Sequence, residues 1–390
     1  MRRLATTTIS DVQPAACLGV AECAADILTF SPVEGAGEAM VMGRPAAGAT
    51  ELTRTVSSRA ERPSGLARHV RAVVRLAWVA LCRLLPNHRG INRLVAGVYF
   101  RRVHGRRPAL PNAPESTIND FIFHRMTGNR WSDLERRCVD KITAKEEAAR
   151  LSASVGIPRT RGMIAMDDMP NASVLYDRLS RFAGEDLVAK PAHGSGATLW
   201  FAQGITRELA QWAFQAWRDD YFWQMRETQY AGLPRRIVIE DAVRKADGAP
   251  PDDYKFMCVR GTPVLLQVDH DRFGPNHLRR LYRLPHFEPY HADDGTPAVG
   301  GWQLAQPELL ADMAALATAL SRPFDYVRID LLLADRPYFG EFTFSQGASL
   351  GRYVPTLIAS NPPQPYGRYL LDRLRENAFG MTGQTPSDVV

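Results

Sequence analysis

The stretch Val327–Phe344, VRIDLLLADRPYFGEFTF, decides the fold of this chain. Two short apolar runs in this region predict two strands, Tyr326–Leu333 and Tyr338–Phe344. The polar segment Ala334–Pro337 between them predicts a turn, so the two strands are expected to form a hairpin.

Each predicted strand carries one carboxylate in an otherwise apolar run, Asp330 in the first and Glu341 in the second. A charge inside a strand costs free energy unless it is paired or holds a metal ion. Arg328 lies two residues before Asp330, so strand alternation puts both on one face. If Asp330 opposes Glu341, the two acids suit magnesium, which prefers oxygen ligands. A salt-bridge cluster of the same three residues on a solvated sheet face is an equal alternative.

The composition is that of a globular protein with room for two or three domains: 390 residues, 45% hydrophobic and 23% charged. The odd number of cysteines, five, and the absence of a CxxC pair argue against a zinc site or a disulfide framework. They favour a reducing cytoplasm. No apolar run is long enough to predict a transmembrane helix.

The positive charge is local. The segment from Arg62 to Pro114 has eleven arginines, no lysine and no acidic residue, and therefore contributes +11. Because the whole chain carries +6, the remainder carries −5. This distribution predicts one anion-binding surface and not a nucleic-acid-binding domain, so we expect no nucleic-acid partner.

Residues 66–85 predict a helix that ends at Pro86. Its arginines gather on one face, and apolar residues with Trp78 occupy much of the rest. Such a basic amphipathic helix can lie in a membrane interface. It can equally pack on its own domain with its arginines in water. The second basic cluster at Arg101–Arg107 favours the membrane interpretation.

From about Asn119 the pattern is that of a compact enzyme of mixed composition. Helices are predicted at Asp133–Val155 and Gln306–Ser321. An aromatic-rich segment, Trp212–Tyr230, predicts a helix packed into a core, with a base-stacking platform as the weaker alternative. Strands are predicted at Asp186–Lys190, Thr198–Ala202, Arg236–Glu240, Tyr254–Val259 and Val264–Val268. Short strands with interspersed helices indicate an α+β or α/β fold.

A second informative stretch is Asp186–Phe201, DLVAKPAHGSGATLWF. One strand ends with Lys190, a glycine-bearing turn follows at His193–Thr198, and a second strand returns. Consecutive N–H groups in such a turn can bind phosphate, and the flanking lysine is a phosphate partner. Taken alone, an ordinary hairpin turn explains the stretch as well. It is not a Walker A loop, which leads into a helix.

Together these motifs resemble the ATP-grasp superfamily, and in detail the TupA-like ATP-grasp group, named for teichuronopeptide biosynthesis. The resemblance covers the chain from about Val95 to Gly367. It rests on five segments in order: VDKITAKEEA, LVAKPAHGSG, RRIVIEDAV, DDYKFMCVRGTPVLLQVDHDR and FDYVRIDLLLADRPYFGEFTF. It implies an α+β (α/β-type) ATP-grasp fold, in which two mixed α/β lobes clasp ATP behind a basic helical N-terminal extension.

The expected organisation has five parts. Residues 1–62 form a disordered extension and residues 63–118 a basic amphipathic helical region. Residues 119–185 form the N-terminal part of the ATP-grasp core. The glycine-loop lobe follows at 186–239, and the lobe that binds metal and nucleotide at 240–380.

The resemblance also implies nucleotide-binding roles. Lys141 and Lys190 would contact the phosphates, and Lys255 would reach the γ-phosphate region. Glu240 would lie by the adenine and ribose. The turn His193–Thr198 would cover the phosphates with His193, Gly194, Ser195 and Gly196.

Further implied roles concern the metal and the second substrate. Asp330 and Glu341 would bind magnesium, and Arg328 would stabilise the charge of the transferred phosphoryl group or of the acyl intermediate. Thr343 stands where many ATP-grasp enzymes have asparagine, and a hydroxyl is a poorer third ligand than an amide carbonyl. The acceptor pocket or its supporting shell is assigned to Asp269, Arg272 and Tyr282.

The implied activity is that of an ATP-dependent carboxylate–amine ligase that forms an amide through an acyl phosphate and releases ADP. ATP and Mg²⁺ are the expected cofactors. The expected substrates are a small-molecule or lipid-linked saccharide acceptor and an amine or amino acid, in cell-surface polysaccharide or capsule biosynthesis. The protein would be cytoplasmic and peripheral on the inner face of the cytoplasmic membrane. One alternative is an ATP-dependent phosphotransferase that acts on a sugar or polysaccharide precursor. Another is a non-catalytic membrane-associated nucleotide-binding protein.

Overall fold

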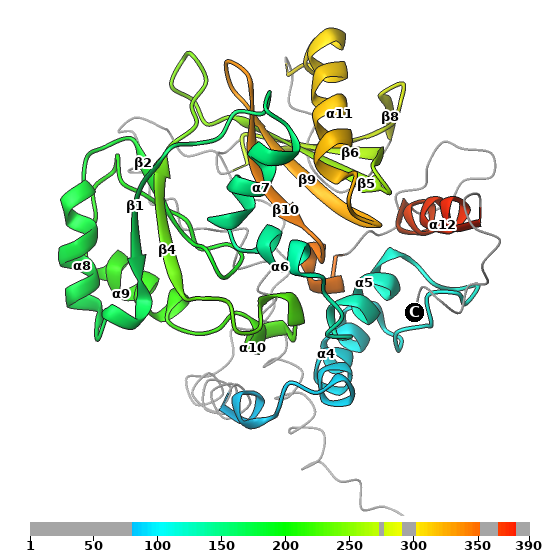
Figure 1. Cartoon of the computed structure of the whole chain (residues 1–390), viewed down its shortest axis with the longest axis horizontal. Helices are drawn as coiled ribbons and strands as arrows, with labels where there is room; N and C mark the ends of the chain where they lie inside the picture. The colour runs from blue at the N-terminus through cyan, green and yellow to red at the C-terminus, as the bar shows by residue number, and fades with distance from the viewer. Residues whose placement is uncertain (1–79, 273–276, 291–301, 352–365, 380–390) are drawn as a thin grey trace, which may run out of the picture.

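The structure of the chain, a computed structural model, describes residues 80–272, 277–290, 302–351 and 366–379 (Figure 1). The extension expected at 1–62 and most of the helix expected at 66–85 lie outside these residues. Residues 80–84, at the end of that helix, are helical. Within the described ranges, no helix combines the length and the apolar character needed to cross a bilayer.

The first of two antiparallel sheets has four strands in the order β1-β4-β2-β3. These strands are β1 (Thr160–Ala165), β4 (Arg236–Asp241), β2 (Leu187–Pro191) and β3 (Leu199–Trp200). One face packs on α8 (Ala172–Leu179) and α9 (Arg207–Trp217), with Ala189, Ile239 and Trp217 in the shared core. Because side chains alternate along a strand, Lys190 and Glu240 project from the other face.

The second sheet has six strands in the order β10-β9-β5-β6-β7-β8, and every neighbouring pair is antiparallel. From one edge to the other the strands are β10 (Pro337–Thr343), β9 (Tyr326–Leu333), β5 (Asp252–Val259), β6 (Thr262–His270), β7 (Leu278–Arg283) and β8 (Glu288–Tyr290). One face packs on α11 (Pro307–Ser321), with Phe256, Ile329 and Met313 in the same core cluster.

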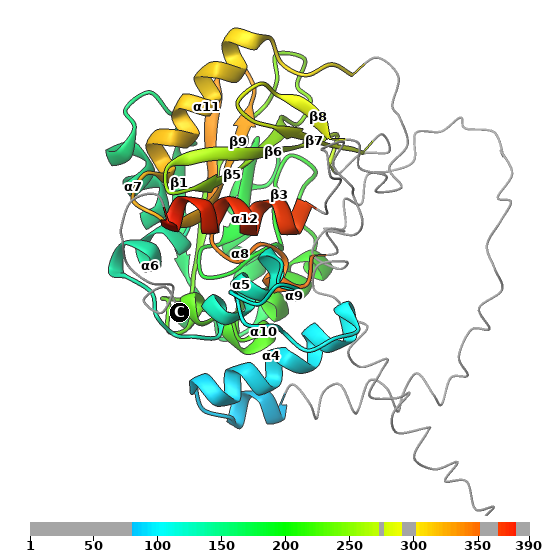
Figure 2. The same cartoon turned by 90° about the vertical axis from the view of Figure 1, so that its right-hand side faces the viewer.

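The opposite face of this sheet is divided into an apolar half and a polar half. On the apolar half, Met257 and Leu265 share a core with Phe123 and Leu370. This core joins the sheet to α4 (Arg89–His104), α5 (Ile118–Met126) and α12 (Tyr366–Phe379), and Figure 2 shows α4 along the outer edge of the molecule. The polar half carries the charged residues of the candidate site.

Shorter elements complete the described chain. Helices α6 (Asp133–Val139) and α7 (Thr143–Leu151) pack beside β10. The single-turn elements are η1 (Met166–Asp168), η2 (Ser180–Phe182), α10 (Phe222–Met225), η3 (Thr228–Tyr230) and η4 (Gln346–Ser349).

The mixed α+β class is confirmed, and so is every predicted strand, with boundary shifts of at most two residues. Strand β9 has the predicted bounds, and β10 begins and ends one residue earlier than predicted. Sequence analysis assigned neither the strands β1, β7 and β8 nor the helices α5, α8 and α12. Strand β1, from the expected segment 119–185, pairs with β4 and therefore belongs to the sheet that carries the glycine loop. The other domain boundaries stay predictions.

Two helix predictions are corrected. The segment Asp133–Val155 divides into α6 and α7, because the Asp140 carboxylate accepts hydrogen bonds from the N–H groups of Ile142 (2.9 Å) and Thr143 (3.2 Å). A side chain that captures backbone donors in this way starts a new helix. The segment Trp212–Tyr230 is not one helix either, since α9 ends at Trp217 and a turn precedes α10.

Candidate active site

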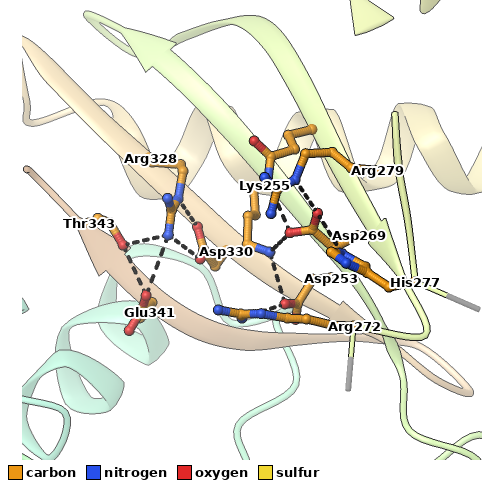
Figure 3. A network of polar contacts seen from close by, with 11 residues as sticks. Asp253, Lys255, Asp269, Arg272, His277, Arg279, Arg328, Asp330, Glu341 and Thr343 are labelled. Carbon is orange, nitrogen blue, oxygen red and sulfur yellow. Dashed lines mark hydrogen bonds and ion pairs between the residues drawn. The ribbon is translucent and has the colours of Figure 1, made fainter. Parts of the chain in front are cut away.

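The hairpin β9–β10 brings Asp330 directly opposite Glu341, which is the register that the magnesium interpretation requires. A register shift at Gly340 sets this pairing. A Cβ at Gly340 would lie 2.9 Å from the Asp330 carbonyl oxygen, so this close approach of the strands requires glycine. Arg328 donates two hydrogen bonds to Asp330, from Nε to Oδ1 at 2.6 Å and from Nη2 to Oδ2 at 2.7 Å (Figure 3).

Thr343 completes this cluster. Its hydroxyl donates to Glu341 Oε1 at 3.1 Å and accepts from Arg328 Nη2 at 3.2 Å. The ion pairs of the salt-bridge alternative are therefore present. The face is only partly solvated, since Asp330 is 6% exposed whereas the Glu341 side chain is 35% exposed.

The two facing carboxyl groups have opposite pKa shifts. Burial raises the pKa of Asp330 to about 6; Arg328 opposes this shift and Glu341 adds to it. Burial would also raise the pKa of Glu341, but Lys141 and Arg328 outweigh it and the pKa is lowered. Glu341 thus holds its charge more firmly than Asp330 does.

The donor set fits magnesium. Asp330, Glu341 and Thr343 offer two carboxylates and one hydroxyl on one sheet face, all oxygen donors. Mg²⁺ commonly takes one or two carboxylates and completes its shell with water and substrate phosphates. No group of three or more His, Cys, Asp or Glu side chains suited to a metal occurs among the described residues.

A second charged cluster lies beside the first on β5 and β6 (Figure 3). Lys255 donates to Asp253 Oδ2 at 2.9 Å and also to Asp269. Arg272 donates to Asp253 Oδ2 at 2.8 Å, and Arg279 donates to Asp269 Oδ1 at 2.6 Å. Burial raises the pKa of Asp269, but the surrounding cations, Lys255 first, hold it well below its usual range.

Three members of this second cluster had no assigned role in the sequence analysis. Asp253 lies in the quoted DDYK motif, and His277 and Arg279 follow the segment 273–276. The His277 ring lies 3.5 Å from Asp269 Oδ1. The available signal was a group of basic residues five to eight positions after VDHDR, which does not by itself show which acid they approach.

Tyr282 does not join this cluster. It pairs in register with Leu266, whereas Arg279 pairs with Asp269, so the two β7 side chains point to opposite faces of the sheet. Tyr282 lies in the core cluster beneath α11 and is 8% exposed. The structure therefore does not bring Tyr282 together with Asp269 and Arg272, because the alternation along β7 turns it to the other face of the sheet.

The four-stranded sheet holds a cluster with excess lysine. Glu240 is 3% exposed, and its two oxygens accept from Lys190 (2.6 Å) and from Lys145. Burial would raise the pKa of Glu240, but the two lysines outweigh it and lower the pKa. Burial lowers the pKa of Lys145, while Glu240 overcomes the same effect at Lys190 and raises its pKa. Sequence analysis missed Lys145, although it lies four residues after Lys141.

The glycine loop runs from β2 to β3 above these lysines. His193, only 2% exposed, turns inward, where its ring bonds the backbone carbonyls of Trp217 (2.9 Å) and Arg236 (3.3 Å). Its side chain therefore anchors the base of the loop. Gly196 and Ala197 have left-handed backbone angles, with φ of 72° and 56°, which makes the turn tight.

Lys141 lies where the two sheets meet. Its ammonium donates to the Gly194 carbonyl of the glycine loop and lies 3.9 Å from Glu341 Oε2. A lysine cluster with a glycine loop on one sheet therefore meets paired carboxylates on a second sheet. This is the arrangement of an ATP-grasp protein.

Residues 164–356 match the model of the family described as TupA-like ATPgrasp, and this region of the chain belongs to that family. The match includes the glycine loop and the whole six-stranded sheet. Lys141 and Lys145 lie before it, and they reach the site only through the fold.

Solved structures with some likeness are ligases. ATP-grasp ligase PsnB complexed with a minimal precursor is 9% identical with a TM-score of 0.32, over 63% of this chain and 62% of that one. D-alanine–D-alanine ligase from Bacillus anthracis, complexed with ATP, is 15% identical with a TM-score of 0.33, over 62% and 66%. The Helicobacter pylori D-alanine–D-alanine ligase is 12% identical with a TM-score of 0.35, over 64% and 60%.

The chain thus spans less than two thirds of the length of these three proteins. The family assignment rests on the sequence match and not on these overlaps. No curated protein matches the chain.

Proposed function

We propose that this protein is an ATP-dependent carboxylate–amine ligase that forms an amide through an acyl phosphate. The observation that carries the proposal is the position of Lys141. It joins the carbonyl of Gly194, in the glycine loop, to the carboxylate of Glu341, in the β9–β10 hairpin. A nucleotide held under the loop would place its phosphates between lysines and the proposed metal ligands.

Each side of the site has a distinct proposed task. Lys141 and Lys190 bind phosphate oxygens, and Glu240 holds Lys190 in place and lies by the ribose and adenine. Lys255 reaches toward the γ-phosphate. Asp330, Glu341 and Thr343 would hold Mg²⁺, which neutralises phosphate charge when bound.

The proposed reaction has two displacements. The acceptor carboxylate attacks the γ-phosphorus, the bond to the bridging oxygen breaks, and ADP leaves. Arg328 stabilises the charge that spreads over the phosphoryl oxygens. The amine then attacks the acyl carbon, the C–O bond to phosphate breaks, and phosphate leaves while the nitrogen loses its proton.

The described cysteines support a mechanism without a thiolate. Cys138 and Cys258 are buried, and burial raises the pKa of each to about 12. A thiol with such a pKa is almost fully protonated at neutral pH and is a poor nucleophile. Acyl-phosphate chemistry requires only positioning and charge neutralisation, which this site supplies.

The second cluster supports an acidic acceptor. Arg272 and Arg279 keep about two fifths of their side chains exposed while pairing with Asp253 and Asp269. They border the proposed metal site on one sheet face, where they can contact a carboxylated acceptor. We propose a saccharide acceptor of cell-surface polysaccharide or capsule assembly, free or lipid-linked, to which an amino acid or another amine is joined.

A trapping experiment tests the ligase proposal without the natural amine. The protein is incubated with ATP, Mg²⁺, a uronic-acid oligosaccharide and hydroxylamine, which converts an acyl phosphate to a hydroxamate. The expected products are ADP, free phosphate and hydroxamate in equal amounts. Carboxylate labelled with ¹⁸O should pass one labelled oxygen to phosphate. ATP binding without any of these products, across acidic saccharides and amino acids, would contradict the ligase proposal.

The same assay distinguishes the ligase from the alternative phosphotransferase activity. A phosphotransferase would use the same nucleotide half of the site but leave the phosphate on a sugar hydroxyl. Phosphorylated saccharide in place of free phosphate would favour that activity. The non-catalytic alternative predicts neither product.

We also propose that the protein lies at the cytoplasmic face of an anionic membrane through its N-terminal helices. Of the seven exposed large apolar side chains among the described residues, five lie between Leu81 and Leu110. Leu94 is 71% and Leu84 81% exposed. No acidic residue occurs between Arg62 and Pro114. Apolar side chains among arginines suit a surface of anionic lipid, where each nearby cation contributes about 1 kcal/mol.

Vesicle binding tests this surface. Because Phe100 is buried in the core, deleting α4 would disturb the fold, so surface substitutions are preferable. Leu84→Gln with Leu94→Gln should weaken binding to phosphatidylserine vesicles at low salt. Met163→Gln is a matched control, since Met163 is 58% exposed on β1. Equal binding by all variants would contradict the assignment of this face.

A further inference from the structure

Glu227 is a buried carboxyl group that the proposed chemistry leaves without a task. It is 3% exposed and belongs to the buried segment Arg226–Gln229. No lysine, arginine or histidine in the part of the chain that the structure describes forms an ion pair with it. Its partners are neutral: Ser345 Oγ donates to Oε1 at 2.5 Å, and Gln229 Nε2 donates to the same oxygen at 3.3 Å. A buried acid without a cation is costly to folding.

On one side Glu227 reaches the glycine loop through Tyr221. The Tyr221 side chain interacts with both Glu227 and Ser195, and Ser195 lies at the exposed part of the loop. The Tyr221 ring lies against Gly194, where a Cβ would come within 3.3 Å of Tyr221 Cβ. Tyr221 therefore supports the loop from below, while Lys141 holds the Gly194 carbonyl.

On the other side Glu227 reaches the end of strand β10. Ser345 lies two residues after Thr343, whose hydroxyl bonds Glu341. Gln229, which donates to Glu227, also donates to the Ser345 hydroxyl. Glu227 is therefore connected to Ser345 both directly and through Gln229. Glu227 thus connects the glycine loop of one sheet to the carboxylate-bearing strand of the other.

The segment that carries Glu227 is itself held firmly. Thr228, the next residue, donates from its hydroxyl to the Met126 carbonyl at 2.7 Å and accepts from Trp131 Nε1 at 2.8 Å. Arg226, the preceding residue, is fully buried and donates to backbone carbonyls near Pro86. These hydrogen bonds fix the backbone segment that carries the Glu227 carboxyl group.

We propose that Glu227 is a positioning residue that sets the glycine loop at its distance from the Glu341 strand, acting through Tyr221 and Ser345. The proposal rests on the proposed function, in which this loop covers the nucleotide phosphates. Removing the connection leaves the loop with more conformations, and ATP binding must then select the productive one. The cost falls on nucleotide affinity more than on stability.

The test removes one hydroxyl group, that of Tyr221. Tyr221→Phe keeps the ring against Gly194 and removes the link to Glu227 and Ser195. We expect the Kd for ATP with Mg²⁺, measured by calorimetry, to rise about tenfold, the effect of one hydrogen bond to a charged group. The melting temperature should change little. Tyr230→Phe is the matched control, because the Tyr230 ring packs on Tyr221 with centroids 4.8 Å apart and should not change the Kd.

A double-mutant cycle separates positioning from a merely structural role. Glu227→Gln should also raise the Kd, and Glu227→Gln with Tyr221→Phe should raise it no further than Tyr221→Phe alone, because both remove one connection. Independent, multiplicative effects would overturn the proposal, as would an unchanged Kd in folded Tyr221→Phe. If Tyr221→Phe does not fold, an unchanged Kd in Glu227→Gln overturns it instead. Failure of the unmodified protein to bind ATP would refute the proposed function itself.

Discussion

Two buried glutamates flank the glycine loop, and they differ in every property except their burial. Glu240 and Glu227 are each 3% exposed. Glu240 lies between Lys145 and Lys190, which lower its pKa although burial opposes them. Among the described residues Glu227 interacts only with hydroxyl and amide groups, and burial raises its pKa to about 7. The comparison teaches that burial alone does not set the direction of a pKa shift. The charge of the neighbouring side chains decides whether the pKa of a buried carboxyl group is raised or lowered.

The same contrast separates the two sheets. Around Glu240, two lysines share one carboxylate, which leaves positive charge for phosphates. On the open face of the six-stranded sheet, Arg328 is shared by two carboxylates, which leaves negative charge for a metal. Four predictions test how far these regions differ.

The largest effect is expected at the carboxylate pair. Asp330→Asn or Glu341→Gln removes one negative charge from the proposed metal site while nearly preserving volume. Turnover should fall by about a hundredfold or more, because the metal neutralises charge during phosphoryl transfer. The melting temperature should be nearly unchanged. Magnesium-dependent ADP release and thermal unfolding measure the two quantities.

A salt-bridge cluster without a metal predicts the reverse for these variants. The melting temperature would fall because Arg328 loses a partner, and turnover per folded molecule would remain. If the Asp330→Asn and Glu341→Gln proteins are destabilised but active, that result contradicts the metal assignment and most of the case for ligase chemistry.

The second effect is on stability in the lysine cluster. Glu240→Gln leaves the buried Lys145 and the partly buried Lys190 without the carboxylate that pairs with both, so the free energy of unfolding should fall by about 3–5 kcal/mol. Glu185→Gln is the control, since Glu185 is exposed and should change it by less than about 0.5 kcal/mol. Urea denaturation at neutral pH gives both values. Equal midpoints would show that Glu240 does not compensate the lysines.

The third effect is a gain of stability in the variant, and its size depends on pH. The pKa of Glu227 is raised from 4.5 to about 7 in the folded protein, so folding retains a proton that the unfolded chain releases between these values. Wild-type stability is therefore lost as pH rises from about 4.5 to 7, by up to about 3 kcal/mol. Glu227→Gln removes this loss.

Melting temperatures measured across this range check the sign. Relative to wild type, Glu227→Gln should gain stability from pH 5 to pH 8. A constant difference between the two proteins would mean that Glu227 titrates as an ordinary glutamate. A gain in stability together with weaker ATP binding would show that the carboxylate is retained for positioning at a cost to stability.

The smallest effect concerns Lys190. Lys190→Ala should raise the Kd for ATP by about tenfold, because a charge-assisted contact to phosphate is lost. Cys138→Ala should leave the Kd unchanged, since Cys138 is 1% exposed in the core cluster beneath α11. Calorimetric titration with ATP measures both. Equal affinity in the two variants would mean that the glycine loop is an ordinary hairpin.

Local pattern was sufficient for the hairpin. The alternation in YVRIDLLL places Arg328 and Asp330 on one face whatever lies around them, and the two predicted strands do pair as a hairpin. The same alternation would have excluded Tyr282 from the Asp269 cluster had strand β7 been recognised. It was not recognised because LRRLYR mixes charged with apolar residues and so lacks a clear apolar alternation.

The long helix predicted at Asp133–Val155 failed for a local reason. The apolar period continues through Val139–Ala144, but the Asp140 side chain competes for the backbone donors there and ends the helix. No sequence motif marked Lys145 or Glu227 as a residue of the site. Both lie in segments whose function depends on partners about a hundred residues away, Glu240 and Ser345.

The sequence by itself determined the two strands that carry Asp330 and Glu341, the glycine turn after Lys190 and the local excess of arginine before residue 115. Each follows from neighbours within a few positions, since strand alternation, turn chemistry and charge density are local properties. Only the tertiary structure decided which charges compensate one another: Lys145 with Glu240, Arg279 with Asp269, and, within the described ranges, no cation with Glu227. The energy of a buried charge depends on groups within a few ångströms, and in this chain those groups come from distant segments.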